Sequence, residues 1–235
     1  MEWGVVVAAD RGAEWLLKWW WNCYRRHHNQ PVAFVDFGMS EEARKWCKAR
    51  GKVIPFEGGN FVKEKEKLSS KLQQKWEGIY GVKVWEARRS WFKKPLAMLQ
   101  SPFEKSVWMD LDCEVCQPID GIFEGVEKGM LGAVRVERGQ YNSGVVVFDQ
   151  EAPLLHAWAK ACLEEHGDAI GDETVLSKII RKNKHPFKEL EREYNWMMGW
   201  GYHPEIKVAH WAANWGKICI ETMGGIQKFL ANAME

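Results

Sequence analysis

The chain has 235 residues, with 33 Lys and Arg against 32 Asp and Glu, so it lacks the strong net charge that would draw it to nucleic acid or to an anionic membrane. Its hydrophobic fraction of 46% can fill a sizeable core, and its length suits one α/β domain. We therefore expect a single domain over residues 1–235 whose function depends on a local site.

The start of the chain shows no export signal. Met1 leads directly into a short apolar run, without the charged start and the cleavage site of a signal peptide. The most apolar segment, Trp15 to Trp21, contains Lys18 and is far shorter than the roughly 20 residues of a membrane-spanning helix. Six cysteines are too few for a disulfide scaffold, so we expect free thiols. Together with the missing export signal and the short apolar segment, this predicts a cytoplasmic location and no transmembrane segment.

Tryptophan, with 15 residues, is the unusual feature of the composition. We expect most of these side chains to fill the core and to line grooves, because indole carries a large apolar surface and one N–H group. Stacking on sugar rings is a secondary role for a few of them. The run Trp19-Trp20-Trp21 is expected in a helix packed on a sheet rather than at a membrane interface.

The first quarter of the chain alternates strands with helices. Trp3–Ala9 is a β-branched apolar run that ends at the turn signal Asp10-Arg11-Gly12 and predicts a buried strand. The elements predicted after it are a helix over 13–28, a strand over 31–37, a helix that begins after the N-cap Ser40, and a strand over 51–56. This order predicts a parallel sheet, and such sheets bind ligands at the carboxyl ends of their strands.

The alternation is interrupted over 58–89, where lysine and glutamate are dense and a solvated helix or a mobile loop is expected. The elements predicted beyond it are a helix over 91–100, strands over 105–110, 130–136 and 141–148, helices over 153–166 and 171–182, and a strand over 206–211. No internal repeat or linker separates them.

Two aspartates one residue apart, Asp110-Leu111-Asp112, follow an apolar strand. Side chains at i and i+2 project to the same side of an extended chain, so a bend there can bring both carboxylates near one hard cation. Mg²⁺ or Mn²⁺ held there would neutralise a diphosphate leaving group. An Asp-x-Asp pair alone is common, and two solvent-facing aspartates in a turn are the alternative. Cys113 and Cys116 form a C-x-x-C without a second pair at zinc spacing, and we interpret both as incidental.

The aspartate pair is one of several motifs that occur in a particular order along the chain. They are VAAD at 7–10, FKKPLAMLQSPFEKSVWMDLD at 92–112, YNSGVVVFD at 141–149, GDETVLSKI at 171–179 and HWAANWGK at 210–217. In order and approximate spacing these motifs resemble the GT-A-fold glycosyltransferases of family 8, the glycogenin and bacterial galactosyltransferase type, and their relatives. The resemblance implies an α/β GT-A fold, with a mainly parallel mixed sheet and helices on both faces. About 1–116 would form the nucleotide-binding half, and about 117–235 the acceptor half.

The resemblance also implies roles for residues that hold the donor. The end of the opening strand, Ala8, Ala9 and Asp10, would contact the nucleotide base. Lys94, an interval of 16 before Asp110 (110 minus 94), would contact a phosphate or the sugar. Asp110, Leu111 and Asp112 would form the metal motif, and His210 would be the third metal ligand. Two carboxylates with an imidazole suit Mn²⁺, which accepts nitrogen as well as oxygen.

On the sugar side the resemblance points to the strand that begins at Asn142-Ser143-Gly144. Glycine there lets a ligand approach the backbone, and asparagine can hydrogen-bond sugar hydroxyls. Asp172 would bind sugar hydroxyls, although the start of a helix also accounts for it.

The sequence departs from the family at two positions. Its glutamine after this aspartate is Glu173 here, which adds a negative charge at the reaction centre, so the acceptor or the mechanism can differ. Its late lysine precedes Pro-Trp, whereas Lys217 precedes Ile218, so Lys217 is the weakest match.

The predicted function is transfer of a sugar from a nucleotide diphosphate sugar, expected to be a UDP-sugar, to a hydroxyl of a glycan, lipid or protein acceptor, with Mn²⁺ or Mg²⁺ as cofactor. The resemblance implies retention of the anomeric configuration. Inversion would need a carboxylate base, which Asp172 or Glu173 would supply. The alternatives are a nucleotidyltransferase on a related sheet and a catalytically silent carbohydrate-binding or interaction protein. A dinucleotide oxidoreductase is disfavoured because no G-x-G-x-x-G follows the first strand.

Overall fold

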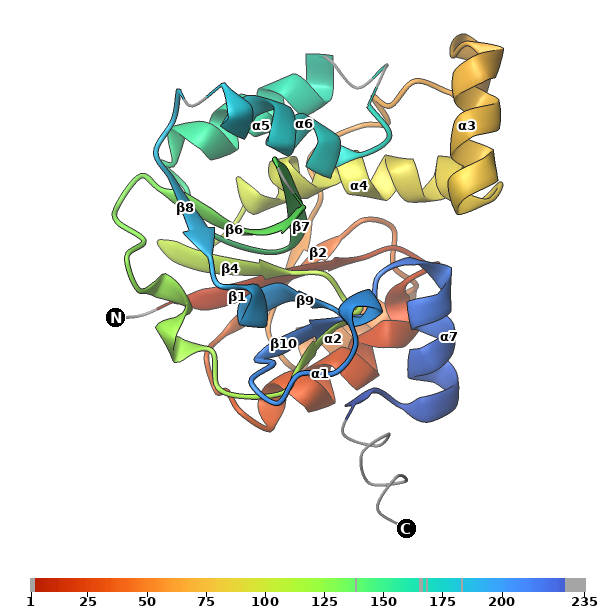
Figure 1. Ribbon diagram of the computed structural model, residues 1–235. Coiled ribbons are helices and arrows are strands. Elements are labelled where there is room, and N and C mark those ends of the chain that lie inside the picture. The colour runs from red at the N-terminus through yellow and green to blue at the C-terminus, as the bar shows by residue number, and fades with distance from the viewer. Residues whose placement is uncertain (1–2, 138, 165–166, 168, 183, 227–235) are drawn as a thin grey trace.

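A seven-stranded sheet in the order β3-β2-β1-β4-β7-β6-β8 forms the centre of the fold (Figure 1). The computed structural model describes residues 3–137, 139–164, 167, 169–182 and 184–226. The strands are β1 Gly4–Ala9, β2 Val32–Asp36, β3 Lys52–Pro55, β4 Lys105–Met109, β6 Leu131–Glu137, β7 Gln140–Asp149 and β8 Phe187–Leu190. β7 pairs antiparallel with β4 and β6, and the other neighbouring pairs are parallel. The sheet is therefore mixed and mainly parallel, as predicted.

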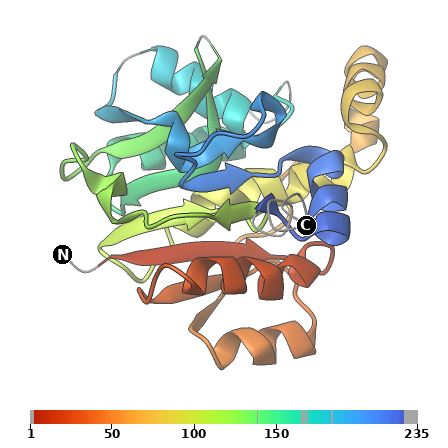
Figure 2. The same cartoon turned by 60° about the horizontal axis from the view of Figure 1, so that its bottom comes forward.

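Helices cover both faces of this sheet because its central strands are apolar on both sides. Val5 and Val7 of β1 face one core, which α1 and α2 cover, and Val6 faces the other, which α4, α5 and α6 cover. Figure 2 shows α1 in red and α2 in orange beneath the strands. The helices are α1 Leu17–Arg25, α2 Glu41–Lys48, α3 Ser70–Tyr80, α4 Val84–Met98, α5 Pro153–Glu164, α6 Asp172–Arg181 and α7 Ala213–Met223.

A small second sheet and α7 complete the described part of the chain. The sheet consists of β5 (Cys113–Val115), β10 (Val208–His210) and β9 (Trp196–Met197), with β10 in the middle. Two residues that follow α7 form hydrogen bonds that hold this helix against the rest of the fold. The carbonyl of Gly224 accepts a hydrogen bond from Trp19 Nε1 at 3.1 Å, and the amide of Ile226 donates to the buried Glu114 Oε2 at 2.7 Å.

The segment 58–89 contains more fixed structure than its composition predicts, because an arginine ties it to the body of the fold. Trp76 of α3 is buried and lies 4.5 Å from the Arg88 guanidinium carbon, measured to the ring centroid. Arg88 donates to the carbonyls of Ile170 and Ala169 at 3.1 and 2.9 Å. The helical alternative is thus the better description of this segment, and α4 begins seven residues before the predicted position of 91 (91 minus 84).

The other predicted elements are present with shifted ends. The helix predicted over 13–28 is a 3-10 turn followed by α1, which ends at Arg25, and the strand predicted over 206–211 is the shorter β10. β5, β8, β9 and α7 were not predicted. In the part of the chain that the structure describes, no helix combines the length and the apolar character needed to cross a membrane, and all six cysteines are free.

Candidate active site

Asp110 and Asp112 lie directly after β4, at the carboxyl edge of the sheet. The amide of Asp110 donates to the carbonyl of Gly144 in β7 at 2.8 Å, and the carbonyl of Asp112 accepts from the amide of Trp211 at 2.9 Å. Main-chain bonds to both sheets therefore hold the pair in place. Leu111 between them is buried in the core, so its side chain does not face the site.

Asp112 contacts two basic side chains. Its Oδ1 is 3.4 Å from His210 Nε2, and its Oδ2 accepts from Lys217 Nζ at 2.9 Å. Burial alone would raise the pKa of Asp112, but the hydrogen bond from His210 and the charge of Lys217 outweigh it and hold this pKa well below its usual range. Burial disfavours the charged, protonated form of His210, yet the hydrogen bond and the charge of Asp112 raise the His210 pKa. The carboxylate is therefore ionised although it is buried.

A chain of side-chain amides fixes the orientation of the His210 ring. The amide N–H of Gly144 donates to Asn142 Oδ1 at 2.8 Å, and the same oxygen accepts from Asn195 Nδ2 at 2.7 Å. Asn195 therefore turns its Oδ1 to His210 Nδ1, which is 3.0 Å away, and we assign a proton to Nδ1. The other ring nitrogen, Nε2, then faces Asp112, to which it donates when it carries a proton, and without that proton it has a lone pair for a metal ion.

Lys94 lies at the centre of a second polar cluster. Its Nζ is 2.9 Å from Asp110 Oδ2, 2.9 Å from Ser143 Oγ, 3.2 Å from the Ser143 carbonyl and 3.8 Å from Asp172 Oδ2. Only 4% of Lys94 is exposed. Burial would lower its pKa, but the charges of Asp110, Asp172 and Glu173 outweigh burial and raise the pKa above the usual range. The ammonium group and the carboxylates thus compensate one another.

The two acidic residues predicted as catalytic begin α6. Asp172 is buried, and its Oδ2 accepts from Ser143 Oγ at 2.7 Å. Glu173 is half-buried, and its Oε1 accepts from Asn142 Nδ2 at 2.6 Å and from the Ser143 amide at 3.3 Å. Burial raises the pKa of both carboxyl groups, and with the added charge of Asp172 it brings the pKa of Glu173 to about 7. Glu173 therefore changes its charge near neutral pH.

Glu173→Gln is expected to flatten the pH dependence of stability. The pKa of Glu173 is about 7 in the folded protein, against about 4.3 in an unfolded chain. Because the pKa is higher in the folded protein, protonation of Glu173 stabilises the fold. This stabilisation is fully present below the pKa of the unfolded chain and is lost as pH rises through the pKa of the folded protein. Urea unfolding should show the wild type losing about 2–3 kcal/mol relative to Glu173→Gln between about pH 5 and about pH 8. The exposed Glu151→Gln should follow the wild type, and parallel curves for all three proteins would contradict the assignment.

Gly144 lets β7 pass directly against the His210 ring. A Cβ at position 144 would lie 2.3 Å from His210 Cε1 and 2.5 Å from its Nδ1. Gly144→Ala is therefore expected to displace the ring and to lower the free energy of unfolding by about 2 kcal/mol. Gly78→Ala in α3 is the matched control, since nothing lies within 4 Å of its added Cβ, and it should stabilise by about 0.5–1 kcal/mol. Chemical denaturation measures both, and equal stabilities of Gly144→Ala and the wild type would refute the clash.

The end of β1 reaches the same edge of the sheet, since β1 is the parallel neighbour of β4. Asp10 Oδ1 accepts from the amides of Gly12 and Ala13, both at 2.9 Å, and its Oδ2 accepts from Ser90 Oγ at 2.6 Å. Its carboxylate thus stabilises its own turn and joins it to α4. Ala8 and Ala9 can offer a ligand here little beyond their main chain.

Among the described residues, potential metal-ligand atoms of Asp112, Cys113 and His210 all lie within 4.8 Å of one another. Asp110 is not in this group. Burial raises the pKa of the Cys113 thiol well above its usual value, and the thiol donates to the Gly144 carbonyl at 3.6 Å. Because the thiolate is the form that binds metals, Asp112 and His210 are the better ligands of the three.

The structure brings most of the predicted site residues into one connected polar network. Its members are Lys94, Asp110, Asp112, Asn142, Ser143, Gly144, Asp172, Glu173, His210 and Lys217. Asn195, which joins its two parts, was not predicted. It ends a 3-10 turn just before the two-residue strand β9, where no motif marks it. Ser90, the partner of Asp10, was missed as well.

This sheet, with the aspartate pair at its carboxyl edge, has the architecture of the GT-A fold, and the solved structures that it resembles are glycosyltransferases. The galactosyltransferase LgtC, solved with donor and acceptor sugar analogues, superposes with a TM-score of 0.61 at 13% identity over 88% of this chain and 86% of that one. Mouse xyloside xylosyltransferase 1, apo form, gives 0.56 at 16% identity over 89% and 97%. The glycosyltransferase GlyE of Streptococcus pneumoniae TIGR4 gives a TM-score of 0.62 at 16% identity. The matched region is 91% of this chain and 56% of the GlyE chain. The predicted GT-A fold is confirmed.

No family model and no curated protein matches the sequence. An active-site mutant of LgtC in which a glutamine is replaced by glutamate is also similar, with a TM-score of 0.60 at 15% identity over 94% of this chain and 95% of that one. At these identities the similarity defines the fold, and the activity has to be argued from the site.

Proposed function

We propose that the protein is a metal-dependent glycosyltransferase that moves a sugar from a UDP-sugar to a hydroxyl acceptor. The observation that carries the proposal is the pairing of Asp112 with His210 beside the cluster of Lys94 and Asp110, at the edge of the sheet where α/β folds bind ligands. The GT-A fold supports it, because the similar solved structures are enzymes of this class.

Asp110, Asp112 and His210 would hold the divalent cation. The chemistry of the donor set fits, because the Nδ1 proton leaves Nε2 of His210 directed at a carboxylate oxygen 3.4 Å away. Carboxylate oxygens with one imidazole favour Mn²⁺ over Mg²⁺, which prefers oxygen ligands alone. When bound, such an ion neutralises a diphosphate and stabilises it as a leaving group.

Two lysines would bind the diphosphate. Lys94 and Lys217 each contact one of the two metal-motif carboxylates at 2.9 Å. In the proposed complex, each ammonium group would exchange its carboxylate partner for a phosphate oxygen. On the other side of Lys94, Asp172 and Asn142 offer an acceptor and a donor to sugar hydroxyls.

Retention is the outcome that we propose for the anomeric carbon. In the transfer, the acceptor oxygen forms a bond to that carbon, the bond to the diphosphate breaks, and the hydroxyl proton leaves with the diphosphate or a carboxylate. Glu173 is the half-buried carboxyl group at the site with a pKa of about 7, which suits a general base of an inverting reaction. NMR analysis of the product anomer tests this choice, since an inverted product would require a carboxylate base, which Asp172 or Glu173 would supply.

A donor-hydrolysis screen with Mn²⁺ across common sugar nucleotides tests the proposed function, because water substitutes for the unknown acceptor. Release of UDP that depends on Mn²⁺ is expected. Release of pyrophosphate from a nucleoside triphosphate would instead favour a nucleotidyltransferase. Binding of glycans without turnover of any donor would favour a catalytically silent carbohydrate-binding protein.

A further inference from the structure

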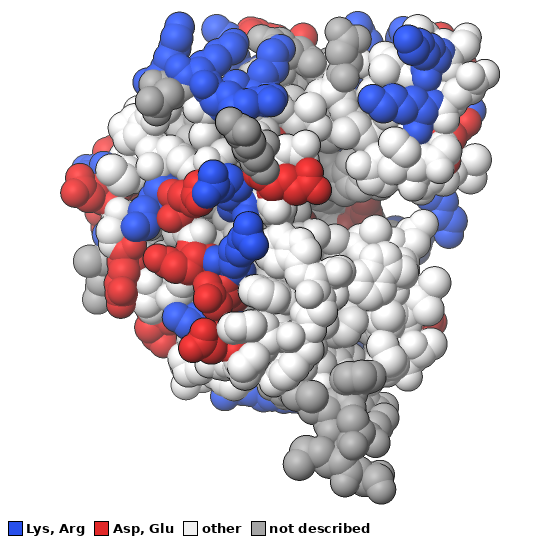
Figure 3. Space-filling model, in the orientation of Figure 1, with Lys and Arg blue, Asp and Glu red and all other residues white. Residues whose placement is uncertain are grey.

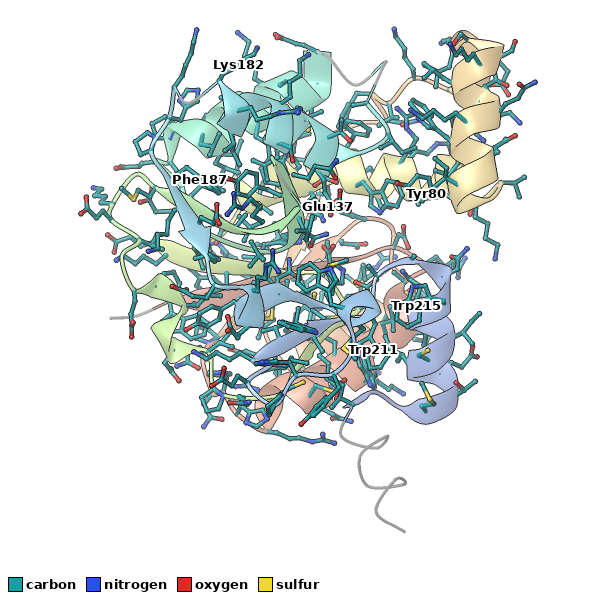
Figure 4. All side chains as sticks on the ribbon, in the orientation of Figure 1. Tyr80, Glu137, Lys182, Phe187, Trp211 and Trp215 are labelled. Carbon is teal, nitrogen blue, oxygen red and sulfur yellow. The ribbon has the colours of Figure 1, made fainter. Side chains whose placement is uncertain are left out.

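Two exposed aromatic side chains stand on opposite sides of a hollow between α3 and α7. Tyr80 ends α3 and Trp215 lies in the first turn of α7, with 41% and 46% of their surfaces exposed. Figure 4 labels Tyr80 above and Trp215 below, and Figure 3 shows the surface hollowed between the two lobes, with acidic atoms visible inside. The ribbon views agree that α3 and α7 stand at the same end of the molecule.

Tyr80 adjoins the acidic side of the candidate site. Its ring meets Trp91 edge-on at a centroid distance of 6.2 Å, and Trp91 packs on Gly171, where an added Cβ would lie 3.1 Å from the indole. Gly171 directly precedes Asp172 and Glu173. Burial and then the charge of Glu173 raise the pKa of Tyr80, which agrees with this proximity.

Trp215 adjoins the metal-motif side in the same manner. Its ring lies 6.2 Å from that of Trp211 at 64°. Trp211 is buried and fixed at two points, because its amide donates to the Asp112 carbonyl at 2.9 Å and its indole N–H donates to Glu114 at 3.0 Å. A buried or half-buried ring therefore supports each exposed ring next to the polar network.

Single exposed apolar residues are common on protein surfaces and need no explanation. These two differ because each is an aromatic ring supported by a second ring, and because carboxylates lie between them. Sugars present the matching chemistry, since a pyranose ring has an apolar C–H face and a rim of hydroxyls. Aromatic rings can take such a face while Glu173 and Asp110 accept from the hydroxyls.

We propose that Tyr80 and Trp215 are stacking surfaces for the sugar rings of a carbohydrate acceptor. This inference rests on the proposed function, because only a transferase has an acceptor. The aliphatic residues Ile79 of α3, Val82 in the turn after it and Ile218 of α7 are also exposed. The acceptor is thereby defined as a glycan that enters between α3 and α7.

Saturation-transfer NMR on the full chain with UDP and Mn²⁺ tests the inference, using methyl glucoside, methyl galactoside and methyl xyloside as probes. At least one probe should bind, with its ring protons receiving saturation. Tyr80→Ala and Trp215→Ala should each weaken that binding about tenfold. Tyr80→Phe keeps the ring and should stay within about twofold of the wild type. Leu163→Ala, an exposed apolar residue of α5, should change nothing.

Calorimetric titration of UDP with Mn²⁺ in the same samples separates the two proposals. Probe binding that depends on the rings, with UDP affinity unchanged, supports both. If UDP binds and no probe does, or if the alanine variants bind probes as the wild type does, the stacking surfaces are refuted and the proposed function stands. Ring-dependent sugar binding without UDP binding would retain the surfaces and overturn the transferase. Binding of octyl but not methyl glycosides would reassign the rings to an apolar partner.

Discussion

Lys94→Met is expected to lower the free energy of unfolding by about 3–5 kcal/mol at neutral pH, because it leaves the carboxylates of Asp110 and Asp172 without their buried cation. Methionine fills a similar volume, so the loss would report charge rather than packing. Part of the loss should be recovered in acid, since the unpaired carboxyl groups then become protonated and neutral. Urea denaturation over a range of pH measures both effects.

The neighbouring Lys93→Met is the matched control for this substitution. Lys93 is only half-buried and lies 5.4 and 5.5 Å from the rings of Phe37 and Phe56 rather than among carboxylates. Its replacement should change the free energy of unfolding by no more than about 0.5 kcal/mol. Similar losses for the two lysines, or a loss for Lys94→Met that is independent of pH, would show that Lys94 does not neutralise the acidic cluster.

Asp112→Asn is expected to weaken Mn²⁺-dependent UDP binding about 100-fold or more, since it removes the charge of a proposed metal ligand while keeping the shape of the side chain. Asp112 also carries the contacts to His210 and Lys217, so the ring and the ammonium group would lose a common partner. Calorimetric titration of UDP with Mn²⁺, and again with EDTA, measures the metal-dependent part. Circular dichroism would confirm that the variant is folded.

A matched control for the metal proposal is Asp120→Asn, because the side chain of Asp120 is 62% exposed and contacts His28 rather than the polar network. This variant should bind UDP with Mn²⁺ as the wild type does. If the wild type binds UDP equally well in EDTA, or if Asp112→Asn retains the Mn²⁺ effect, the metal ligands have been assigned wrongly.

The central sheet was predictable because its strands are long apolar runs that must be buried. β1, β2, β4 and β7 each show such a run, and the turn after β1 and the acids after β4 mark their ends. Topology could place the aspartate pair at the carboxyl edge of the sheet, whereas the Asn-Ser-Gly strand and the start of α6 were assigned to the site by their resemblance to the family. Their mutual hydrogen bonds follow from that placement.

What the sequence left open depends on contacts between distant segments. β9 has two residues and β5 and β10 have three each, so none carries a periodicity that could be recognised. α3 appeared to be a solvated segment because its anchors, such as Trp76 against Arg88, are contacts between side chains of two different helices. Asn195 orients His210 through a series of side-chain hydrogen bonds that no local sequence pattern predicts. Glu173 could be recognised as a departure from the family, but its pKa depends on burial beside Asp172.

The fastening of the segment after α7 has a consequence for biosynthesis. His210 and Lys217 come late in the chain, and the segment that carries them is secured to early residues by Trp19 and to the middle of the chain by Glu114. On the ribosome, β1 to β4 can emerge and begin to pair while Asp112 still lacks both of its basic partners. The proposed metal site would therefore be assembled last, after residue 226 has left the exit tunnel, and a nascent chain would lack the complete set of proposed ligands until then.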